Sequence, residues 1–263
     1  MILVWKRVCK KTQREFSEKW DEVYEHIDIF SSNRSKKAIL PKELTEDIAY
    51  LMGFILADGY IKNDEKLLQR GEYPEYTIAL YDNSREFLEQ LNIFFKQIFN
   101  VTCNLHFAKD KKGSWYVLRC TSKPVHRFFT LVLGIKKGNK TGNIDTPDII
   151  KKSSEDIQKS FVSGFFDGEM GVGITKKNPW LEMAQSSITK EPVPIIIWMK
   201  KKLEKWGIDL HGPSLMSNQN AWRLRTNSKT TISKYYSIIS SRHPDKIKQF
   251  EEIERFYYDT NRS

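Results

Sequence analysis

Cysteines are few in this 263-residue chain, and long apolar runs are missing. Cys9, Cys103 and Cys120 are an odd number without Cys-x-x-Cys spacing, so we expect reduced thiols rather than a disulfide framework. No run approaches the roughly 20 apolar residues that span a bilayer. The apolar start at Met1 is too brief for a secretory signal. These absences predict an intracellular protein, cytoplasmic in a prokaryote or organellar.

Signatures of several enzyme classes are also missing. The scattered histidines form no His-Asn-His or zinc pattern, which disfavours a histidine-metal nuclease. Gly168, Gly171 and Gly173 lack the order of a dinucleotide-binding fingerprint. Residues 138–141 lack the upstream glycine of a phosphate-binding loop. A terminal His-Asn pair, typical of protein-splicing elements, is absent, so we expect a free-standing or intron-encoded enzyme.

Positive charge, in contrast, is in excess. The chain has 43 lysines and arginines against 33 acidic residues, which gives a net charge of +10 and a pI near 9.3. The basic residues are spread along the sequence, a distribution that favours nucleic acid as a partner. With 40% apolar residues, the chain can bury a core in one large domain or two smaller ones.

An apolar stretch from Leu51 to Gly59 ends in a carboxylate and a glycine. If it is helical, Gly53 and Ala57 share one face, where a second helix can approach closely. Gly59 is then expected as a left-handed C-cap. Asp58 falls in the last turn, where the helix dipole disfavours a negative charge by about 0.3–1 kcal/mol unless a cation is nearby. A residue such as Asp58, which is unfavourable for the local structure, indicates a functional role.

A second stretch, from Phe161 to Glu169, repeats the pattern. Gly164 and Gly168 have the same four-residue spacing, and Glu169 takes the place of Asp58. Two helices packed through these small residues would bring the two acids together, and neighbouring carboxylates repel unless a positive ion lies between them. The pattern therefore predicts a divalent metal site formed by the two acids.

Both stretches resemble the motif of the LAGLIDADG homing endonucleases. Six of the nine positions from Leu51 to Gly59 match that motif. The second stretch resembles the variant that ends in Asp-Gly-Glu through Gly164, Asp167, Gly168 and Glu169. It departs from the motif at Met170, which stands where a glycine is usual, and Gly171 comes one residue late.

An internal duplication accompanies the two motifs. Residues 115–123 align with residues 221–229 at an offset of 106, whereas the two acids are 111 residues apart. The second copy must therefore be about five residues shorter, and the first hairpin loop is the obvious place for the loss. In the first copy we expect strands near 60–69, 75–82, 101–109 and 115–121, and helices near 84–98 and from Pro124.

The resemblance covers about residues 40–245 and implies an α+β fold of two pseudo-twofold-related αββαββα repeats. Antiparallel sheets would form a DNA-binding saddle, with the two motif helices at the repeat interface. The interface residues would be Gly53, Ala57, Gly164 and Gly168. We expect an N-terminal helical extension (1–44), a first repeat (45–138), a linker (139–158) and a second repeat with a C-terminal helix (159–263).

The activity implied by the resemblance is a site-specific, Mg²⁺-dependent DNA endonuclease that acts as a monomer. It would make a staggered double-strand break with 3′ overhangs across the minor groove. Asp58 and Glu169 would be both metal ligands and catalytic residues. Lys123 and Lys229 follow the fourth strand of each repeat and are candidates for polarising water or stabilising developing charge.

Gln185 stands where relatives place a water-organising glutamine. An offset of 105 aligns it with Leu80, with Asp82 on the same strand face, so the two halves are unequal. DNA contacts are expected from polar side chains on the sheet faces and hairpin tips. These are Lys62, Gln69, Arg70, Arg119, Lys176, Lys177, Arg223 and Arg225.

Two alternatives to DNA cleavage stay open. A protein of the same fold can act without cutting, either as an RNA maturase that helps its host intron to fold or as a DNA-binding regulator. An RNA-cutting enzyme is the second alternative. The presence of both acids favours cutting.

Overall fold

The computed structural model describes residues 38–63, 69–71, 75–111, 113–140, 142, 144–176, 178–216 and 220–260, together with Glu18 and Asp21. Most of the predicted N-terminal extension therefore lies outside the described residues. The chain divides into two compact units. The first comprises the chain up to Asn139 with residues 147–161, and the second comprises residues 140–146 with the chain from Val162. The predicted linker thus contributes to both units.

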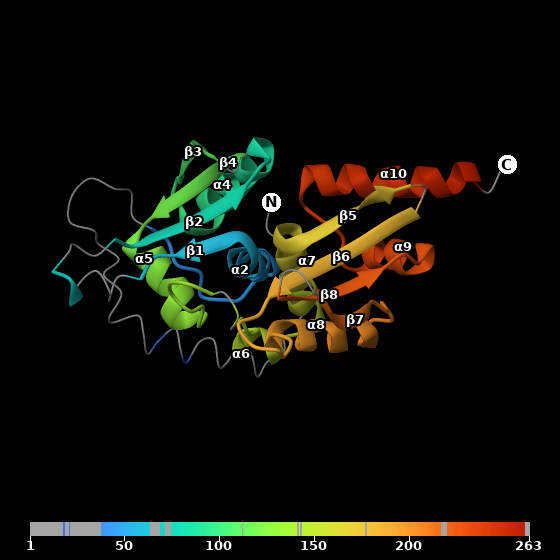
Figure 1. Ribbon diagram of the computed structural model, residues 1–263. Helices are drawn as coiled ribbons and strands as arrows, with labels where there is room; N and C mark the ends of the chain where they lie inside the picture. The colour runs from blue at the N-terminus through green and yellow to red at the C-terminus, as the bar shows by residue number, and fades with distance from the viewer. Residues whose placement is uncertain are drawn as a thin grey trace. The chain divides into compact units, whose positions relative to one another are not determined.

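The first unit contains one four-stranded antiparallel sheet with the strand order β1-β2-β4-β3 (Figure 1). Its strands are β1 Gly59–Ile61, β2 Thr77–Asp82, β3 Asn104–Asp110 and β4 Gly113–Thr121. Its helices are α2 Glu46–Asp58, α4 Arg85–Phe99, α5 Lys123–Arg127, the π-helical η1 Phe128–Val132 and α6 Asp148–Lys151. Helix α7, Glu155–Glu169, begins in this unit and ends in the second one.

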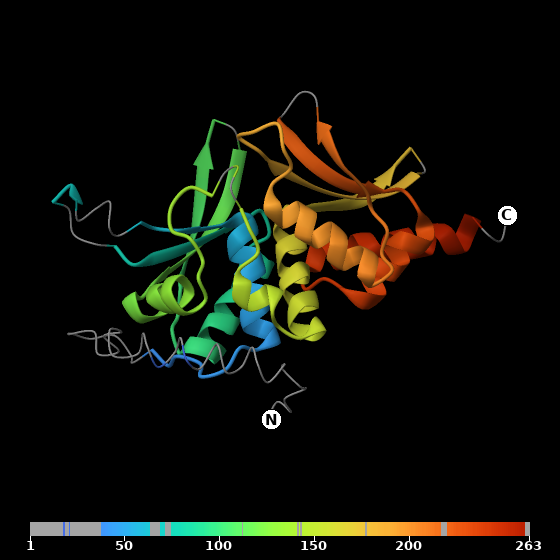
Figure 2. The ribbon, with the colours of Figure 1, turned by 90° about the horizontal axis from the view of Figure 1, so that it is seen from below.

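The second unit repeats the strand order in a sheet β5-β6-β8-β7. Its strands are β5 Met170–Thr175, β6 Asn178–Ser186, β7 His211–Met216 and β8 Ala221–Thr226. Its further helices are α8 Pro194–Lys205, α9 Lys229–Ile238 and α10 Pro244–Thr260, and Figure 2 shows α8 and α10 on the same side of the sheet. Two αββαββα repeats, each with an antiparallel sheet, are therefore confirmed.

Helix α2 is enclosed on all sides. Thr45 caps its start, because the Thr45 hydroxyl accepts a hydrogen bond of 3.1 Å from the Ile48 N–H. Every residue from Ile48 to Ala57 is buried, as expected for a helix that is apolar all round. The Phe54 ring meets the Phe87 ring of α4 edge-on at 5.2 Å. Asp58 is the first residue in this run that is partly exposed.

The pairing registers confirm the duplication and locate its length changes. The pair Gly59–Leu80 corresponds to Met170–Met183, and Leu80–Leu118 corresponds to Met183–Leu224. The offset between the copies thus falls from 111 to 103 along the first hairpin and rises to 106 at the last strand. The second copy loses residues in the first hairpin loop, as predicted, but it loses eight there instead of about five and regains three before β8.

Gly59 is not the left-handed C-cap that we predicted. Its φ of −101° and ψ of 166° are extended, and it is the first residue of β1, paired with Leu80. Strand pairing begins at once after the helix, so no left-handed turn can form. Glycine is needed here for space: a Cβ on Gly59 would lie 2.6 Å from both the Cα and the carbonyl oxygen of Ile55.

The first hairpin also differs from the prediction. Strand β1 ends at Ile61, whereas we predicted a strand from 60 to 69. Lys62 and Asn63 are not in a strand, and Gln69 is helical. The other elements of the first repeat follow the predicted pattern, with α4 capped by the Ser84 hydroxyl and the β3–β4 hairpin closing between Asp110 and Gly113.

Two smaller findings concern the thiols and the membrane. Cys103 and Cys120 are buried, and the neighbouring Cys120 side chain together with burial raises the pKa of the Cys103 thiol. Among the described helices, none is long and apolar enough to cross a bilayer.

Replacing Gly59 with alanine should destabilise the protein by about 1–3 kcal/mol, because the added methyl group would overlap the backbone of Ile55. The matched control is Gly173→Ala in β5, where the nearest atoms, in the Trp180 ring, are 3.7 Å from the new Cβ. Thermal or urea unfolding checks this difference. Equal midpoints for the two variants would contradict the proposed close contact.

Candidate functional site

The two acids predicted as metal ligands stand where a helix passes directly into a strand. Asp58 ends α2 and is followed by β1, and Glu169 ends α7 and is followed by β5. No loop residue intervenes in either case, so each carboxylate has a fixed place at the start of its sheet. Both acids are partly exposed. Solvent and ligands can therefore reach them, although their metal-binding role stays a prediction.

Met170 fits this junction although it departs from the motif. It occupies the position of Gly59 and pairs with Met183 as Gly59 pairs with Leu80. Met170 is in a strand, a backbone conformation that a residue with a side chain adopts without strain. The close contact with the Ile55 backbone, which requires glycine at position 59, is a feature of the first repeat.

Gly171 has a different role, because a Cβ on it would lie 2.7 Å from the Trp180 ring. The late glycine thus makes room for the indole, whose Nε1 donates a hydrogen bond of 3.0 Å to the Thr175 hydroxyl. The Trp180 ring thus packs over the backbone of β5.

The other acid of the second motif, Asp167, is a structural residue. Only 1% of it is exposed. Its carboxylate accepts hydrogen bonds from the Ser241 hydroxyl at 2.5 Å and from the Arg242 N–H at 2.8 Å. Burial raises the pKa of Tyr235, and the charge of Asp167 adds to this effect. The Asp167 carboxylate therefore links α7 to the segment before α10. Glu169, which is partly exposed, stays the predicted metal ligand of this motif.

A lysine that the sequence did not point to secures the end of α7. The Lys246 ammonium donates hydrogen bonds to the carbonyl oxygens of Phe166 and Asp167, at 2.9 and 2.5 Å. These oxygens belong to the last turn of the helix, where backbone carbonyls lack intrahelical donors and the dipole attracts a cation. Lys246 thus supplies the positive charge that an acid in the last turn requires. It is 77 positions beyond Glu169, so no local pattern could reveal it.

The alignment of Gln185 with Leu80 was wrong. The registers make Leu80 equivalent to Met183, so Gln185 corresponds to Asp82 at an offset of 103. Asp82 comes two positions after Leu80, the strand partner of Gly59. Gln185 comes two positions after Met183, the strand partner of Met170. Gln185 is buried on the same strand face as Met183, and Asp82 accepts a hydrogen bond of 2.6 Å from the Ser84 N–H. The two repeats therefore differ at this position.

Lys123 and Lys229 are equivalent in structure, as the sequence predicts. Each is the first residue of a helix, α5 or α9, and each follows a serine. The Lys123 ammonium lies 5.7 Å from the centre of the Tyr76 ring, and that of Lys229 lies 4.5 Å from the centre of the Tyr257 ring. Their catalytic role stays a prediction.

In the second unit, strand alternation separates a buried face from an open face of the sheet. Leu181, Met183 and Gln185 of β6 are buried. The residues between them, with their partners on β8, form the open face: Trp180, Glu182, Ala184, Arg223 and Arg225. Both predicted DNA-binding arginines are thus on the open face, where Glu182 pairs with them.

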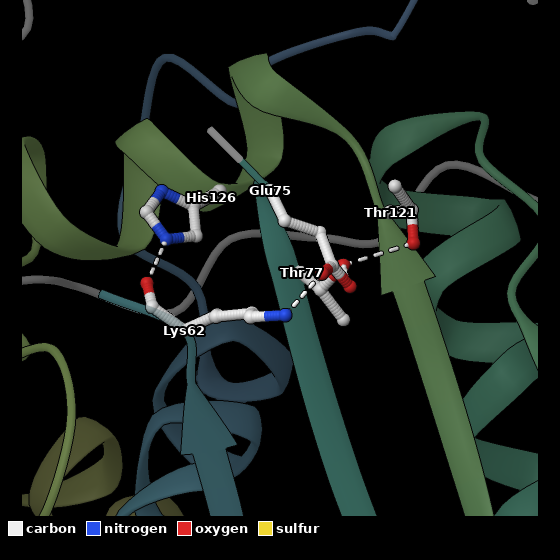
Figure 3. A network of polar contacts seen from close by, with 5 residues as sticks. All are labelled: Lys62, Glu75, Thr77, Thr121 and His126. Carbon is white, nitrogen blue, oxygen red and sulfur yellow. Dashed lines mark hydrogen bonds and ion pairs between the residues drawn. The ribbon is translucent and has the colours of Figure 1, made fainter. Parts of the chain in front are cut away.

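In the first unit, Arg119 is exposed on the face opposite to buried Leu118 and Cys120. Lys62, which follows β1 of the same unit, forms an ion pair with Glu75 (Figure 3). The Glu75 carboxylate also accepts a hydrogen bond of 3.3 Å from Thr77. The hydrogen bond from Lys62 and the positive charges of Lys62 and Arg119 hold the pKa of Glu75 below its usual value.

The Lys62 backbone is fixed by a buried histidine. Its carbonyl oxygen accepts a hydrogen bond of 2.8 Å from the His126 ring, as Figure 3 shows. This contact ties the end of β1 to α5. It anchors the residue that the sequence predicted as a DNA contact.

The remaining predicted DNA contacts that the structure describes lie in connections between strands. Gln69 and Arg70 are exposed in the connection between β1 and β2. Lys176 is exposed at the tip of the β5–β6 hairpin, with a positive φ of 49°. Lys177 lies outside the described residues.

The donor chemistry fits a hard divalent cation such as Mg²⁺. The described residues contain no group of three His, Cys, Asp or Glu side chains that would form a metal cage. Mg²⁺ commonly uses one or two carboxylates and completes its shell with water and substrate phosphates. The residues that would hold it are Asp58 and Glu169.

Comparison with known proteins shows what this chain resembles. Residues 45–132 match the model of the LAGLIDADG-like domain. The chain is 27% identical over 182 residues to the homing endonuclease I-ApeI of Aeropyrum pernix, which covers 68% of this chain and 78% of that protein. It is 24% identical over 253 residues to glutamine–fructose-6-phosphate aminotransferase (isomerizing) of Methanocaldococcus jannaschii. That match covers 93% of this chain but only 20% of the aminotransferase, so the chain spans a fifth of its length.

Solved structures of homing endonucleases share the fold. The structure of I-WcaI bound to its DNA recognition sequence has a TM-score of 0.53 at 14% identity and covers 87% of this chain and 91% of I-WcaI. That of I-DmoI in complex with DNA and Ca has a TM-score of 0.52 at 18% identity and covers 80% of this chain and 97% of I-DmoI. Residues 45–132 thus match a LAGLIDADG-like domain, and the predicted resemblance to single-chain, two-motif LAGLIDADG homing endonucleases is confirmed.

Lys246→Met should lower the free energy of unfolding by about 1–3 kcal/mol, because the last turn of α7 loses two charge-assisted hydrogen bonds and a favourable charge. Lys248→Met is the matched control on the same helix, since Lys248 is exposed and pairs with nearby Asp245 at 3.7 Å. Urea unfolding of both variants measures the difference. A Lys246→Met variant as stable as the control would contradict the capping role.

Proposed function

We propose that this protein is a site-specific DNA endonuclease that requires a divalent metal ion, most simply Mg²⁺. It makes a staggered double-strand break with 3′ overhangs across the minor groove and works as a monomer. The observation that carries the proposal is that Asp58 and Glu169 occupy the same position in two equivalent repeats, each at a direct junction of helix and strand. A duplex target offers two strands, so two equivalent acids suit it.

The residues of this chain divide the work between binding and chemistry. Asp58 and Glu169 hold the metal, which when bound activates water and offsets the charge on the phosphate. Lys123 and Lys229 stabilise negative charge that develops on the phosphate oxygens. The sheet residues Arg119, Arg223 and Arg225, the residues Lys62, Gln69, Arg70 and Lys176 of the strand connections, and Lys177 contact the DNA.

The known relatives support this assignment by their names and structures. I-ApeI is a homing endonuclease, and I-WcaI and I-DmoI were solved with DNA. I-DmoI has been solved with DNA together with Ca or Mn. We infer the same class of substrate and cofactor for this chain.

Replacing either motif acid should reduce double-strand cleavage by at least about 100-fold, because each strand depends on one acid and on the metal that it holds. The variants are Asp58→Asn and Glu169→Gln. Cleavage is followed on a library of random duplex DNA with Mg²⁺ and with EDTA, and the cut ends are sequenced. Binding to the recovered site in EDTA should change little.

Matched controls remove an acid from the exposed first turn of the same helices, Glu46→Gln for α2 and Glu155→Gln for α7. Both should cut at the wild-type rate. Tight binding without any cutting by the wild type would favour a regulator or an intron RNA maturase over the nuclease. Cutting of only the RNA version of the recovered site would identify an RNA-cutting enzyme.

A further inference from the structure

A carboxylate lies among the cations on the open face of the second sheet. One oxygen of Glu182, Oε2, is 3.3 Å from Nη1 of Arg223 and 3.5 Å from Nη1 of Arg225. Glu182 stands directly opposite Arg225 in the strand register and diagonal to Arg223. The arginine side chains remain 35% and 39% exposed, and Glu182 is 22% exposed. One acid thus joins two half-exposed guanidinium groups.

The neighbours restrict where this carboxylate can go. Gly171 is the partner of Glu182 on β5, and the Trp180 ring fills the space above it. On the other side, Glu182 faces Arg225, whose own next partner is His211 of β7. Arg225 Nε is buried and has no hydrogen-bond partner among the described residues. Among the described residues, Glu182 therefore orients the guanidinium group of Arg225 through this ion pair.

The equivalent position of the first sheet differs. Arg119 corresponds to Arg225 at the offset of 106, but its partner on the neighbouring strand is Ala79 instead of a glutamate. The acid Glu75 forms its ion pair with Lys62. A glutamate directly opposite the arginine is therefore a feature of the second repeat.

Stability does not explain this arrangement, because ion pairs between half-exposed side chains contribute little to folding. On a DNA-binding face, a carboxylate repels phosphates and so weakens sequence-independent binding. An arginine whose guanidinium group is already oriented can instead offer two parallel N–H groups to the O6 and N7 atoms of guanine. The cost of ordering its side chain is then lower.

We propose that Glu182 is a specificity-determining positioning residue, which directs Arg223 and Arg225 toward guanine edges in the major groove and weakens their contacts with phosphates. This inference rests on the proposed function. The residue acts through the arginines and is separate from the catalytic acids.

The test compares the wild type with Glu182→Gln, an isosteric change that removes the charge. Both proteins bind a random duplex DNA library in EDTA, and the bound sequences are read. The wild type should select a site with guanine at one or two positions that the variant reads less strictly. The variant should bind non-specific duplex about three- to tenfold more tightly at low salt, with a salt slope steeper by about one, because one more cation is available to phosphates. Its ratio of specific to non-specific affinity should fall about tenfold.

The matched control is Glu204→Gln in α8, which removes an exposed acid that pairs with Lys200 at 3.1 Å. It should change neither base preference nor the salt slope. Arg225→Lys provides a second variant, which keeps the charge but loses the planar fork. It should relax the same base positions as Glu182→Gln while leaving the salt slope at the wild-type value.

The outcomes separate the inference from the proposed function. A wild type with a defined site, together with a Glu182→Gln variant of unchanged base preference, overturns the inference alone. Equal losses of specific and non-specific affinity in the variant also overturn it, because they indicate a merely structural role. A wild type that selects no sequence overturns the proposed function and this inference with it.

Discussion

The direct passage from a buried helix into the first strand of a sheet is the constraint on which each repeat depends. Ten successive buried residues fix α2, and β1 pairs with β2 from its first residue, Gly59. Asp58 stands between two rigid elements and has no loop through which to move. The same junction in the second repeat holds Glu169, where Lys246 secures the last turn of the helix from the side of α10. A carboxylate in an unfavourable place within the helix dipole is thereby kept in one position, as a metal ligand requires.

The charge pattern of the sheets adds a second level of control. A net charge of +10 attracts any polyanion, and this attraction by itself does not distinguish one DNA sequence from another. A carboxylate that pairs with two arginines, as Glu182 does, would reduce that uniform attraction locally and orient the two guanidinium groups. In the first repeat, Arg119 stands opposite Ala79 and the acid Glu75 pairs with Lys62. The two sheets therefore differ in which cation an acid holds.

Much of the fold could be predicted from the sequence because its signals are local or repeated. Helix α4, strands β3 and β4 and the offset of 106 all depend on residues close in the chain or on a direct comparison of the copies. Gly59 was misassigned because helix-capping rules ignore the strand that pairs with it. Gln185 was misaligned because the sequence shows only the net difference of five residues between the copies. The separate loss of eight residues before β6 and gain of three after it could not be seen. Lys246 and Glu182 act through contacts with distant strands and helices, which a linear pattern does not contain.

The positions of the length changes explain how the two repeats can diverge without losing their acids. A shift of a single residue in strand pairing would move every side chain to the opposite face of the sheet. The loss of eight residues falls in the β5–β6 hairpin, and the gain of three falls between β6 and β8, where the connection to α8 is longer. Neither change alters the pairs that link Met170, Met183 and Leu224. Loops and open-face residues can therefore change while the junction that holds each acid keeps its register.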